Sequence, residues 1–167
     1  MKDKTRENLQ DAFAGESQAH MKYMAFADAA EREKLPNVAR LFRAASYAEQ
    51  MHATNHLRAL GGIGKTSENL AAAFAGETFE INEMYPSYMA VAEQEGEKRA
   101  LGSMDDALAA EKVHAALYAA AQTAIAAGKD ISDAPVFVCE TCGYTVEGEA
   151  PEKCPVCGAV RTKFKQF

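Results

Sequence analysis

Apolar side chains between residues 5 and 127 recur at alternating steps of three and four, which is the spacing of one helix face. The pattern predicts four helices, with expected ranges of 5–34, 36–60, 67–99 and 101–127. Helices of this length extend roughly 40 Å at ~1.5 Å per residue. Their number and length favour a mainly α four-helix bundle.

Proline and glycine mark the breaks in this pattern. Pro36 suits the first turn of the second helix, because the N–H that it lacks has no partner there. The glycine-rich run 61–64 ends that helix. Pro86 lies inside the third helix and removes one backbone hydrogen bond, so we expect a bend at this point.

A second, smaller domain is expected near the carboxyl end of the chain. Gly128 stops the fourth helix, and residues 129–135 form a short linker. Alanine gives way to Val, Thr, Cys, Gly and Pro beyond the linker. We therefore expect a helical domain over 1–133 and a small domain over 134–167.

The helical region contains an internal repeat that carries glutamate and histidine. Asn8–Glu16 recurs as Asn69–Glu77, and Glu49-x-x-His52 recurs as Glu111-x-x-His114. Residues three apart share a helix face, so each Glu-x-x-His can direct an oxygen and a nitrogen to one point. A glutamate on an apolar seam is costly unless it is paired or bound to a metal. This pattern is typical of di-iron and di-manganese bundles; solvated or ion-paired side chains on misassigned faces are the alternative.

Glu80 interrupts the repeat, because Ala19 stands at the corresponding position in the first half. The third helix therefore carries a spare carboxylate three residues after Glu77. Two interpretations are open for Glu80. It is either a surface residue, or an alternative ligand that a metal recruits when its positive charge increases.

Two histidines and two tyrosines lie close to the repeated residues without being clear ligands. His20 and His56 stand one turn beyond Glu16 and His52, and the repeat duplicates neither, so we expect packing or supporting roles. Tyr23 and Tyr85 follow the repeated Gly-Glu pairs by about two turns. They either donate hydrogen bonds to ligand carboxylates or fill the core.

All four cysteines lie in the small domain, as Cys139-x-x-Cys142 and Cys154-x-x-Cys157. Two such knuckles predict a tetrahedral site with four thiolate ligands. Iron and zinc both suit four thiolates, and a zinc site would serve to staple a domain too small to fold alone. Clustered cysteines also favour a reducing compartment over a secreted disulfide framework.

Composition narrows the classes of function and location. The formal net charge of −6 argues against nucleic acid as the main partner, because phosphate binding needs an excess of Lys and Arg. No apolar run approaches the ~20 residues of a membrane span. The N-terminal residues lead into no signal-peptide core, so we expect a cytoplasmic protein.

Together these motifs resemble the rubrerythrin family over essentially the whole chain. The residues that carry the resemblance are Gly15-Glu16, Glu49-x-x-His52, Gly76-Glu77-x-x-Glu80, Met84-Tyr85-Pro86, Glu111-x-x-His114 and the two cysteine knuckles. The resemblance implies a ferritin-like di-iron bundle followed by a rubredoxin-like Fe(Cys)4 domain, in which zinc can substitute. It also implies a non-haem peroxidase that reduces hydrogen peroxide to water and protects against oxidative stress.

The resemblance further implies a role for each site residue. Glu49 and Glu111 would bridge two irons, and Glu16 and Glu77 would be terminal ligands. His114 would hold one iron, while the other would exchange His52 for Glu80 between redox states. The expected catalytic residues are therefore Glu80 and His52, with Tyr23 and Tyr85 beside them.

The protein is expected to need an external electron donor and to form an oligomer. A rubredoxin or an NAD(P)H-dependent reductase would be the donor. The fourth helix extends ~26 Å beyond Glu111, whereas the linker reaches at most ~23 Å, so a neighbouring chain's tail should serve each site in a homodimer or larger oligomer. Ferroxidase activity with iron storage is the alternative function, and a non-catalytic docking protein with a zinc-stapled tail is another.

Overall fold

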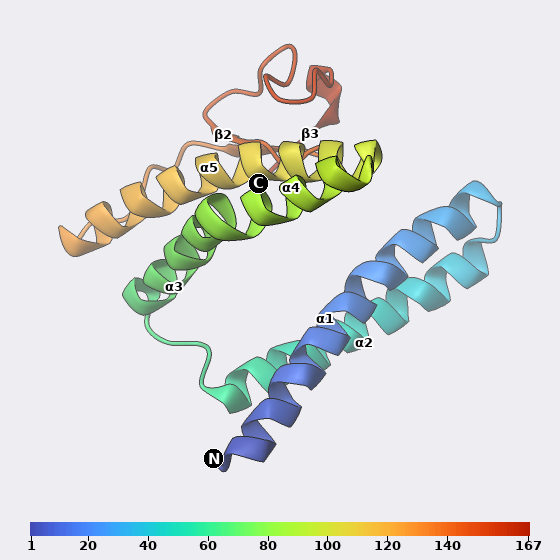
Figure 1. Ribbon diagram of the computed structural model, residues 1–167, viewed down its shortest axis with the longest axis horizontal. Helices are drawn as coiled ribbons and strands as arrows, with labels where there is room; N and C mark the ends of the chain where they lie inside the picture. The colour runs from blue at the N-terminus through green and yellow to red at the C-terminus, as the bar shows by residue number, and fades with distance from the viewer. The chain divides into compact units, whose positions relative to one another are not determined.

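The computed structural model describes all 167 residues, which divide into two compact units, Met1–Gly64 and Lys65–Phe167. The first unit is a hairpin of two helices, and the second combines helices with a small sheet (Figure 1). The predicted fold class, mainly α with a small β and cysteine-knuckle region, is confirmed. None of the helices is both long enough and apolar enough to span a bilayer. The domain boundary expected at 133/134 stays a prediction.

The first unit pairs α1 (Asp3–Arg32) with α2 (Pro36–Leu60). Small buried side chains line the contact between the two helices. Ala39, Ser46 and Ala53 follow one another at intervals of seven along α2, and Ala27 and Ala30 are buried on α1. A seven-residue interval returns to the same helix face, so these small residues let the two backbones approach closely.

The second unit begins with three helical segments where the sequence predicted one bent helix. They are α3 (Thr66–Phe79), the π-helical turn η1 (Glu80–Met84) and α4 (Tyr85–Glu95). The expected disturbance at Pro86 is therefore a wider helical turn that precedes the proline. The segment also ends at Glu95 instead of residue 99, because Gly96 adopts a left-handed conformation with φ of 74°.

The last helix, α5 (Lys98–Ala126), packs against α3 and α4. Beyond it lies a three-stranded antiparallel sheet of β1 (Val136–Cys139), β2 (Thr145–Glu147) and β3 (Phe164–Gln166), with β1 in the centre. A 3₁₀ turn, η2 (Arg161–Lys163), precedes β3. In Figure 1, α5 lies between the α3–α4 segments and this small sheet. The helix thus contacts both parts of the second unit.

Candidate metal centres

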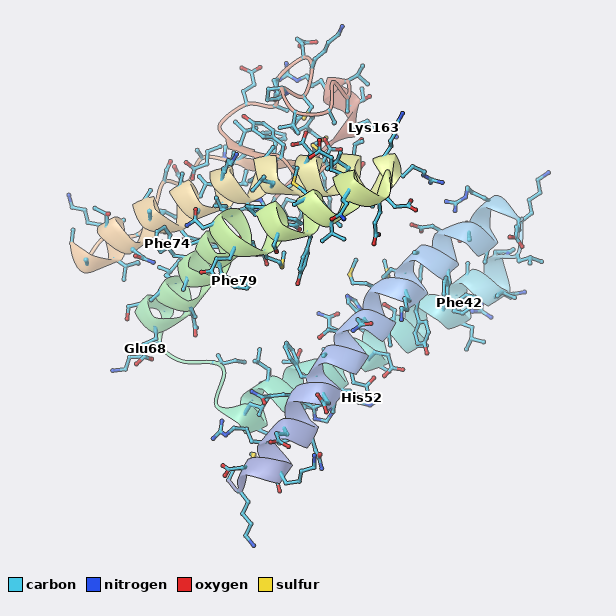
Figure 2. The ribbon with its side chains drawn as sticks, in the orientation of Figure 1. Phe42, His52, Glu68, Phe74, Phe79 and Lys163 are labelled. Carbon is cyan, nitrogen blue, oxygen red and sulfur yellow. The ribbon has the colours of Figure 1, made fainter.

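The first cluster of metal-ligating side chains lies on the α1–α2 hairpin. Glu16 comes from α1, and Glu49 and His52 come from α2, where Figure 2 marks His52. His52 Nδ1 lies 2.8 Å from Glu49 Oε2 and 3.9 Å from Glu16 Oε1. One ligand atom from each residue falls within 4.8 Å of the others. The i, i+3 spacing on α2 therefore places two donors beside a third from α1, as the repeat predicts.

The second cluster repeats this arrangement on the other unit. Glu77 comes from α3, and Glu111 and His114 come from α5, again with their ligand atoms within 4.8 Å of one another. His114 Nδ1 lies 2.6 Å from Glu111 Oε2. The His114 side chain is 27% exposed, against 55% for His52 in the first cluster. The second cluster is thus the more enclosed of the two.

Burial and crowding disfavour negative charge in the second cluster. Burial raises the pKa of Glu77 to about 7. A hydrogen bond to the Glu111 carboxylate and the negative charge of Glu111 add to this effect. Burial also raises the pKa of Glu80, and the charge of Glu111 adds to the effect. Carboxylates this close repel unless a proton or a cation lies among them. The donor set therefore fits a bound metal ion, which would keep all of these groups ionised.

The residues that the sequence placed beside the ligands divide into two groups. Burial raises the pKa of the Tyr85 phenol, and the charges of Glu80, Glu111 and Glu77 add to the effect. Tyr85 therefore lies close to the second cluster. Tyr23 instead belongs to an aromatic group with Phe26 and Phe42, with ring centroids 6.2 Å from each. These contacts are the core packing that the sequence left open for Tyr23, and its expected role beside the ligands stays a prediction.

His20 has a packing role of the kind expected from the sequence. Its Nδ1 lies 2.9 Å from the carbonyl oxygen of Ser46 and 2.8 Å from the Ser46 hydroxyl, and that hydroxyl donates to the His20 carbonyl. Ser46 is only 1% exposed. These bonds join α1 to α2 inside the hairpin, and neither His20 nor His56 belongs to the first cluster.

The four cysteine sulfurs converge in the small sheet region, and none is in a disulfide. Cys139 Sγ lies 3.7 Å from Cys157 Sγ, and Cys142 Sγ lies 3.5 Å from Cys154 Sγ. Both knuckles close in the same way, because Gly143 and Gly158 donate their N–H groups to the carbonyls of Cys139 and Cys154. Both glycines have positive φ, which a residue with a Cβ rarely adopts.

The knuckles prepare the sulfurs to hold a cation. Burial opposes ionisation of Cys139, but the N–H groups of Thr141 and Cys142 outweigh it and lower the pKa of this thiol to about 7. Burial dominates at Cys142 and Cys157 and raises the pKa of both thiols. Four thiolates cannot share this space without a metal, so the set fits the predicted tetrahedral site.

The small sheet region contacts α5 of its own chain at the second cluster. His114 Nε2 lies 2.9 Å from Thr145 Oγ1 on β2, and a Cβ at Gly143 would be 3.8 Å from that of Ala110. The tail therefore reaches His114 of its own chain, although the linker length had favoured service by a neighbouring chain. The four residues of β1 add ~13 Å to the reach of the linker. The predicted oligomer loses this supporting argument and stays a prediction.

Comparison with known proteins agrees with these two kinds of centre. The family model for rubrerythrin matches residues 7–122, and the model for the rubredoxin-like domain of rubrerythrin matches residues 137–165. The chain belongs to the rubrerythrin family. Its predicted cofactors, a di-iron centre and a four-cysteine iron site, are those of the family. The individual ligand assignments stay predictions.

Several relatives of this rubrerythrin family member align along nearly its full length. Rubrerythrin-2 of Clostridium acetobutylicum is 40% identical, over 98% of this chain and 96% of the relative. Nigerythrin of Nitratidesulfovibrio vulgaris is 35% identical, over 98% of this chain and 86% of its own. A solved structure of nigerythrin in a mixed-valence state covers the same shares of the two chains, with a TM-score of 0.56 and 35% identity.

Proposed function

We propose that the protein is a peroxidase that reduces hydrogen peroxide to water and so protects the cell against oxidative stress. The observation that carries this proposal is the contact between His114 and Thr145, which seats the four-cysteine region against a carboxylate–histidine cluster. A site that accepts single electrons is then directly beside residues that suit a metal with redox activity. Membership of a family of oxidoreductases supports the same conclusion.

The proposed metal ligands are the two clusters and the four cysteines. Together the clusters supply four carboxylates and two imidazoles, the donors expected for two irons. When bound, two ferrous ions supply the two electrons that hydrogen peroxide takes up, with two protons, to form two water molecules. The proposed ligands are Glu16, Glu49, His52, Glu77, Glu111, His114, Cys139, Cys142, Cys154 and Cys157.

Glu80 has the proposed role of an additional carboxylate ligand that replaces His52 as the positive charge of the centre rises. It lies where burial and Glu111 disfavour its ionised form, so extra positive charge nearby would have a large effect on it. It is also the first residue of η1, where the backbone leaves regular α-helical spacing. Wider helical turns of this kind occur often at functional sites.

Tyr85 is proposed to act as a neutral hydrogen-bond donor beside the second cluster. A phenol of ordinary pKa is already protonated at neutral pH, and burial raises the pKa of Tyr85 further above its ordinary value of 10.0. A phenol O–H among carboxylates can orient a ligand carboxylate or bind a peroxide oxygen. The proposed electron donor to the four-cysteine site is a rubredoxin or an NAD(P)H-dependent reductase.

Stopped-flow mixing of the chemically reduced, iron-loaded protein with hydrogen peroxide or with oxygen tests the proposal. We expect peroxide to oxidise the protein much faster than oxygen does at equal concentration. A clear preference for oxygen would instead indicate the alternative, ferroxidase activity of an iron-storage type. A colourless protein with zinc in place of iron would indicate the non-catalytic docking protein.

Replacement of one cysteine ligand tests the proposed route of the electrons. Cys157→Ser should abolish reduction by an external donor, because the four-thiolate site loses a ligand. It should still allow a single peroxide turnover of chemically reduced protein at saturating iron, because the helical clusters keep all of their own ligands. Steady-state turnover with a rubredoxin and its reductase, compared with single-turnover kinetics, distinguishes the two effects. Full steady-state activity in the variant would contradict the proposed route.

A further inference from the structure

A single buried hydroxyl joins the small sheet region to a proposed metal ligand. Thr145 opens β2 and is 7% exposed. Its Oγ1 has two partners, the carbonyl oxygen of Gly143 at 3.0 Å and Nε2 of His114 at 2.9 Å. The sequence gives no pattern for this residue, because Thr145 and His114 lie far apart along the chain.

Counting protons sets the direction of both hydrogen bonds. A carbonyl oxygen can only accept, so the one hydroxyl proton of Thr145 goes to Gly143. Thr145 Oγ1 then accepts from His114, which places the proton of the imidazole on Nε2. The reverse direction would leave the half-buried Gly143 carbonyl without this donor, at the cost of an unsatisfied polar group.

The position of this proton decides what the other ring nitrogen can do. A neutral imidazole with its proton on Nε2 has a free lone pair on Nδ1. In the metal-free protein Nδ1 lies 2.6 Å from Glu111 Oε2, a hydrogen bond that needs a proton between the two atoms. A metal ion would displace that proton and take up both lone pairs, with Glu77 in the same cluster. Lone pairs that converge in this way can bind one cation together.

We propose that Thr145 is a positioning residue for the metal centre: its hydroxyl keeps the His114 proton on Nε2 and so presents Nδ1 to the metal. A second-layer partner of this kind sets both the tautomer and the ring orientation of a ligating histidine. Here the partner belongs to a different part of the fold from the ligand itself. The orientation of His114 therefore depends on how the sheet region is seated on α5.

The same contact links the two metal sites energetically. Thr145 stands two residues after Gly143, whose N–H closes the first cysteine knuckle. A metal in the knuckles orders this segment, and so fixes the acceptor that orients His114. Loading the four-cysteine site therefore strengthens metal binding at the Glu77, Glu111 and His114 cluster, and the reverse effect is equal by thermodynamic linkage.

The hydroxyl also continues a bonded path between the two sites. Gly143 follows Cys142 directly, its carbonyl accepts from Thr145, and Thr145 accepts from His114. The use of this path as a route for electrons rests on the proposed peroxidase function. The tautomer and the binding linkage need no redox chemistry.

The test uses the full-length protein with zinc in all sites, because zinc is diamagnetic and has no redox chemistry. Nitrogen-15 NMR of the imidazole rings reports which nitrogen of His114 carries a proton, and loss of the signal in His114→Ala assigns it. Three variants are compared. Thr145→Val removes the hydroxyl, Thr145→Ser keeps it, and Thr123→Val removes a hydroxyl that bonds only within α5.

We expect a slowly exchanging Nε2–H signal from His114 in the wild type, in Thr145→Ser and in Thr123→Val. In Thr145→Val this proton should exchange rapidly with water, while the amide spectrum of the sheet stays unchanged. Competition with a chelator should show zinc binding to the helical cluster weakened by roughly tenfold in Thr145→Val alone. Rescue by serine separates loss of the hydroxyl from a merely structural change.

Two results would overturn the inference. The first is a wild-type protein in which His114 carries its proton on Nδ1 and binds zinc through Nε2. This result needs no variant, so it counts even if Thr145→Val fails to fold. The second is equal zinc affinity and an equally protected Nε2–H in Thr145→Val. Failure of the proposed peroxidase reaction would leave all of these measurements unaffected, so the two proposals can fail separately.

Discussion

The backbone N–H of Tyr85 donates to the carbonyl of Glu80, five residues earlier in the chain. This bond defines the π-helical turn η1, and the next residue, Pro86, explains its place. Pro86 has no N–H to donate to Asn82, and its ring would collide with the Asn82 carbonyl in a regular α-helix. The wider turn avoids that collision, and it places Glu80 and Tyr85 together beside the second cluster.

Pro86→Ala should allow η1 to return to α-helical spacing, because alanine supplies the missing N–H. We expect Glu80 to rotate away from Tyr85, so that the pKa of the Tyr85 phenol falls by the part that the Glu80 charge contributes, while the larger effect of burial remains. The free energy of unfolding should rise by less than ~1 kcal/mol, because the proline already occupies the first turn of α4. Ultraviolet titration of the tyrosines, with Tyr85→Phe subtracted, measures the pKa.

Pro36→Ala is the matched control for this experiment. Pro36 also occupies the first turn of its helix, α2, and lies in the other unit. Its replacement should leave the Tyr85 titration unchanged. An unaltered Tyr85 pKa in Pro86→Ala would show that the π-helical turn does not depend on the proline.

Glu80→Ala should leave metal binding mostly intact but slow peroxide turnover by roughly 10- to 100-fold. The reason is that Glu80 lies outside the three-residue cluster of Glu77, Glu111 and His114, yet close enough for Glu111 to act on its charge. Metal analysis and steady-state kinetics on the same samples measure the two effects. Glu83→Ala, an exposed carboxylate on the same turn, is the control and should turn over like the wild type. Unchanged turnover in Glu80→Ala would remove the ligand-exchange role.

Periodicity and repetition were enough to predict most of the helical segments and the residues of the two carboxylate–histidine clusters. Residues at i and i+3 share a helix face whatever the surroundings, so Glu49 with His52 and Glu111 with His114 needed no tertiary information. The knuckles are equally local, since each closes through a bond from a glycine to a cysteine four residues earlier. These features follow from short-range geometry.

Features that depend on competing backbone hydrogen bonds, or on contacts between residues far apart in the chain, were not predictable. Pro86 indicated a disturbance, but whether a helix bends or widens depends on which hydrogen bonds the rest of the fold can replace. The contact of Thr145 with His114 joins residues 31 positions apart. It arises because β2 packs against α5, so that the chain returns to this helix beyond the linker and β1.

Stability of the metal-free protein should fall as pH rises from about 4.5 to about 7, as far as Glu77 contributes. The folded state raises the pKa of Glu77 from 4.5 to about 7, so in this range the folded protein binds more protons than the unfolded chain. The contribution of Glu77 to the free energy of unfolding is fully present below pH 4.5 and is lost as pH rises through about 7. Urea unfolding of the metal-free protein at several pH values measures this slope.

Glu77→Gln should remove the part of the slope that belongs to Glu77, because the amide does not titrate. Glu93→Gln, an exposed position on α4, should keep the wild-type slope. Bound metal should also remove this part of the slope, since it stabilises the ionised carboxylate. A wild-type slope in Glu77→Gln would assign the pH dependence to other groups.

Tyr85→Phe and Tyr23→Phe form a matched pair, because each removes only a phenol oxygen. The sequence places the two tyrosines at similar distances after a repeated Gly-Glu, but their surroundings differ. Burial and three carboxylates act on Tyr85, whereas Tyr23 packs against the rings of Phe26 and Phe42.

We therefore expect Tyr85→Phe to lower peroxide turnover by roughly tenfold with little change in stability, because a hydrogen-bond donor beside the ligands is lost. Tyr23→Phe should keep turnover within about twofold of the wild type, because its ring contacts survive the change. Single-turnover kinetics of the reduced protein, together with thermal unfolding, separates the two cases. Equal loss of activity in both variants would mean that Tyr23 also acts on the metal ligands. Glu80, which has alanine as its counterpart in the first half of the repeat, would then be the remaining difference among the proposed catalytic residues.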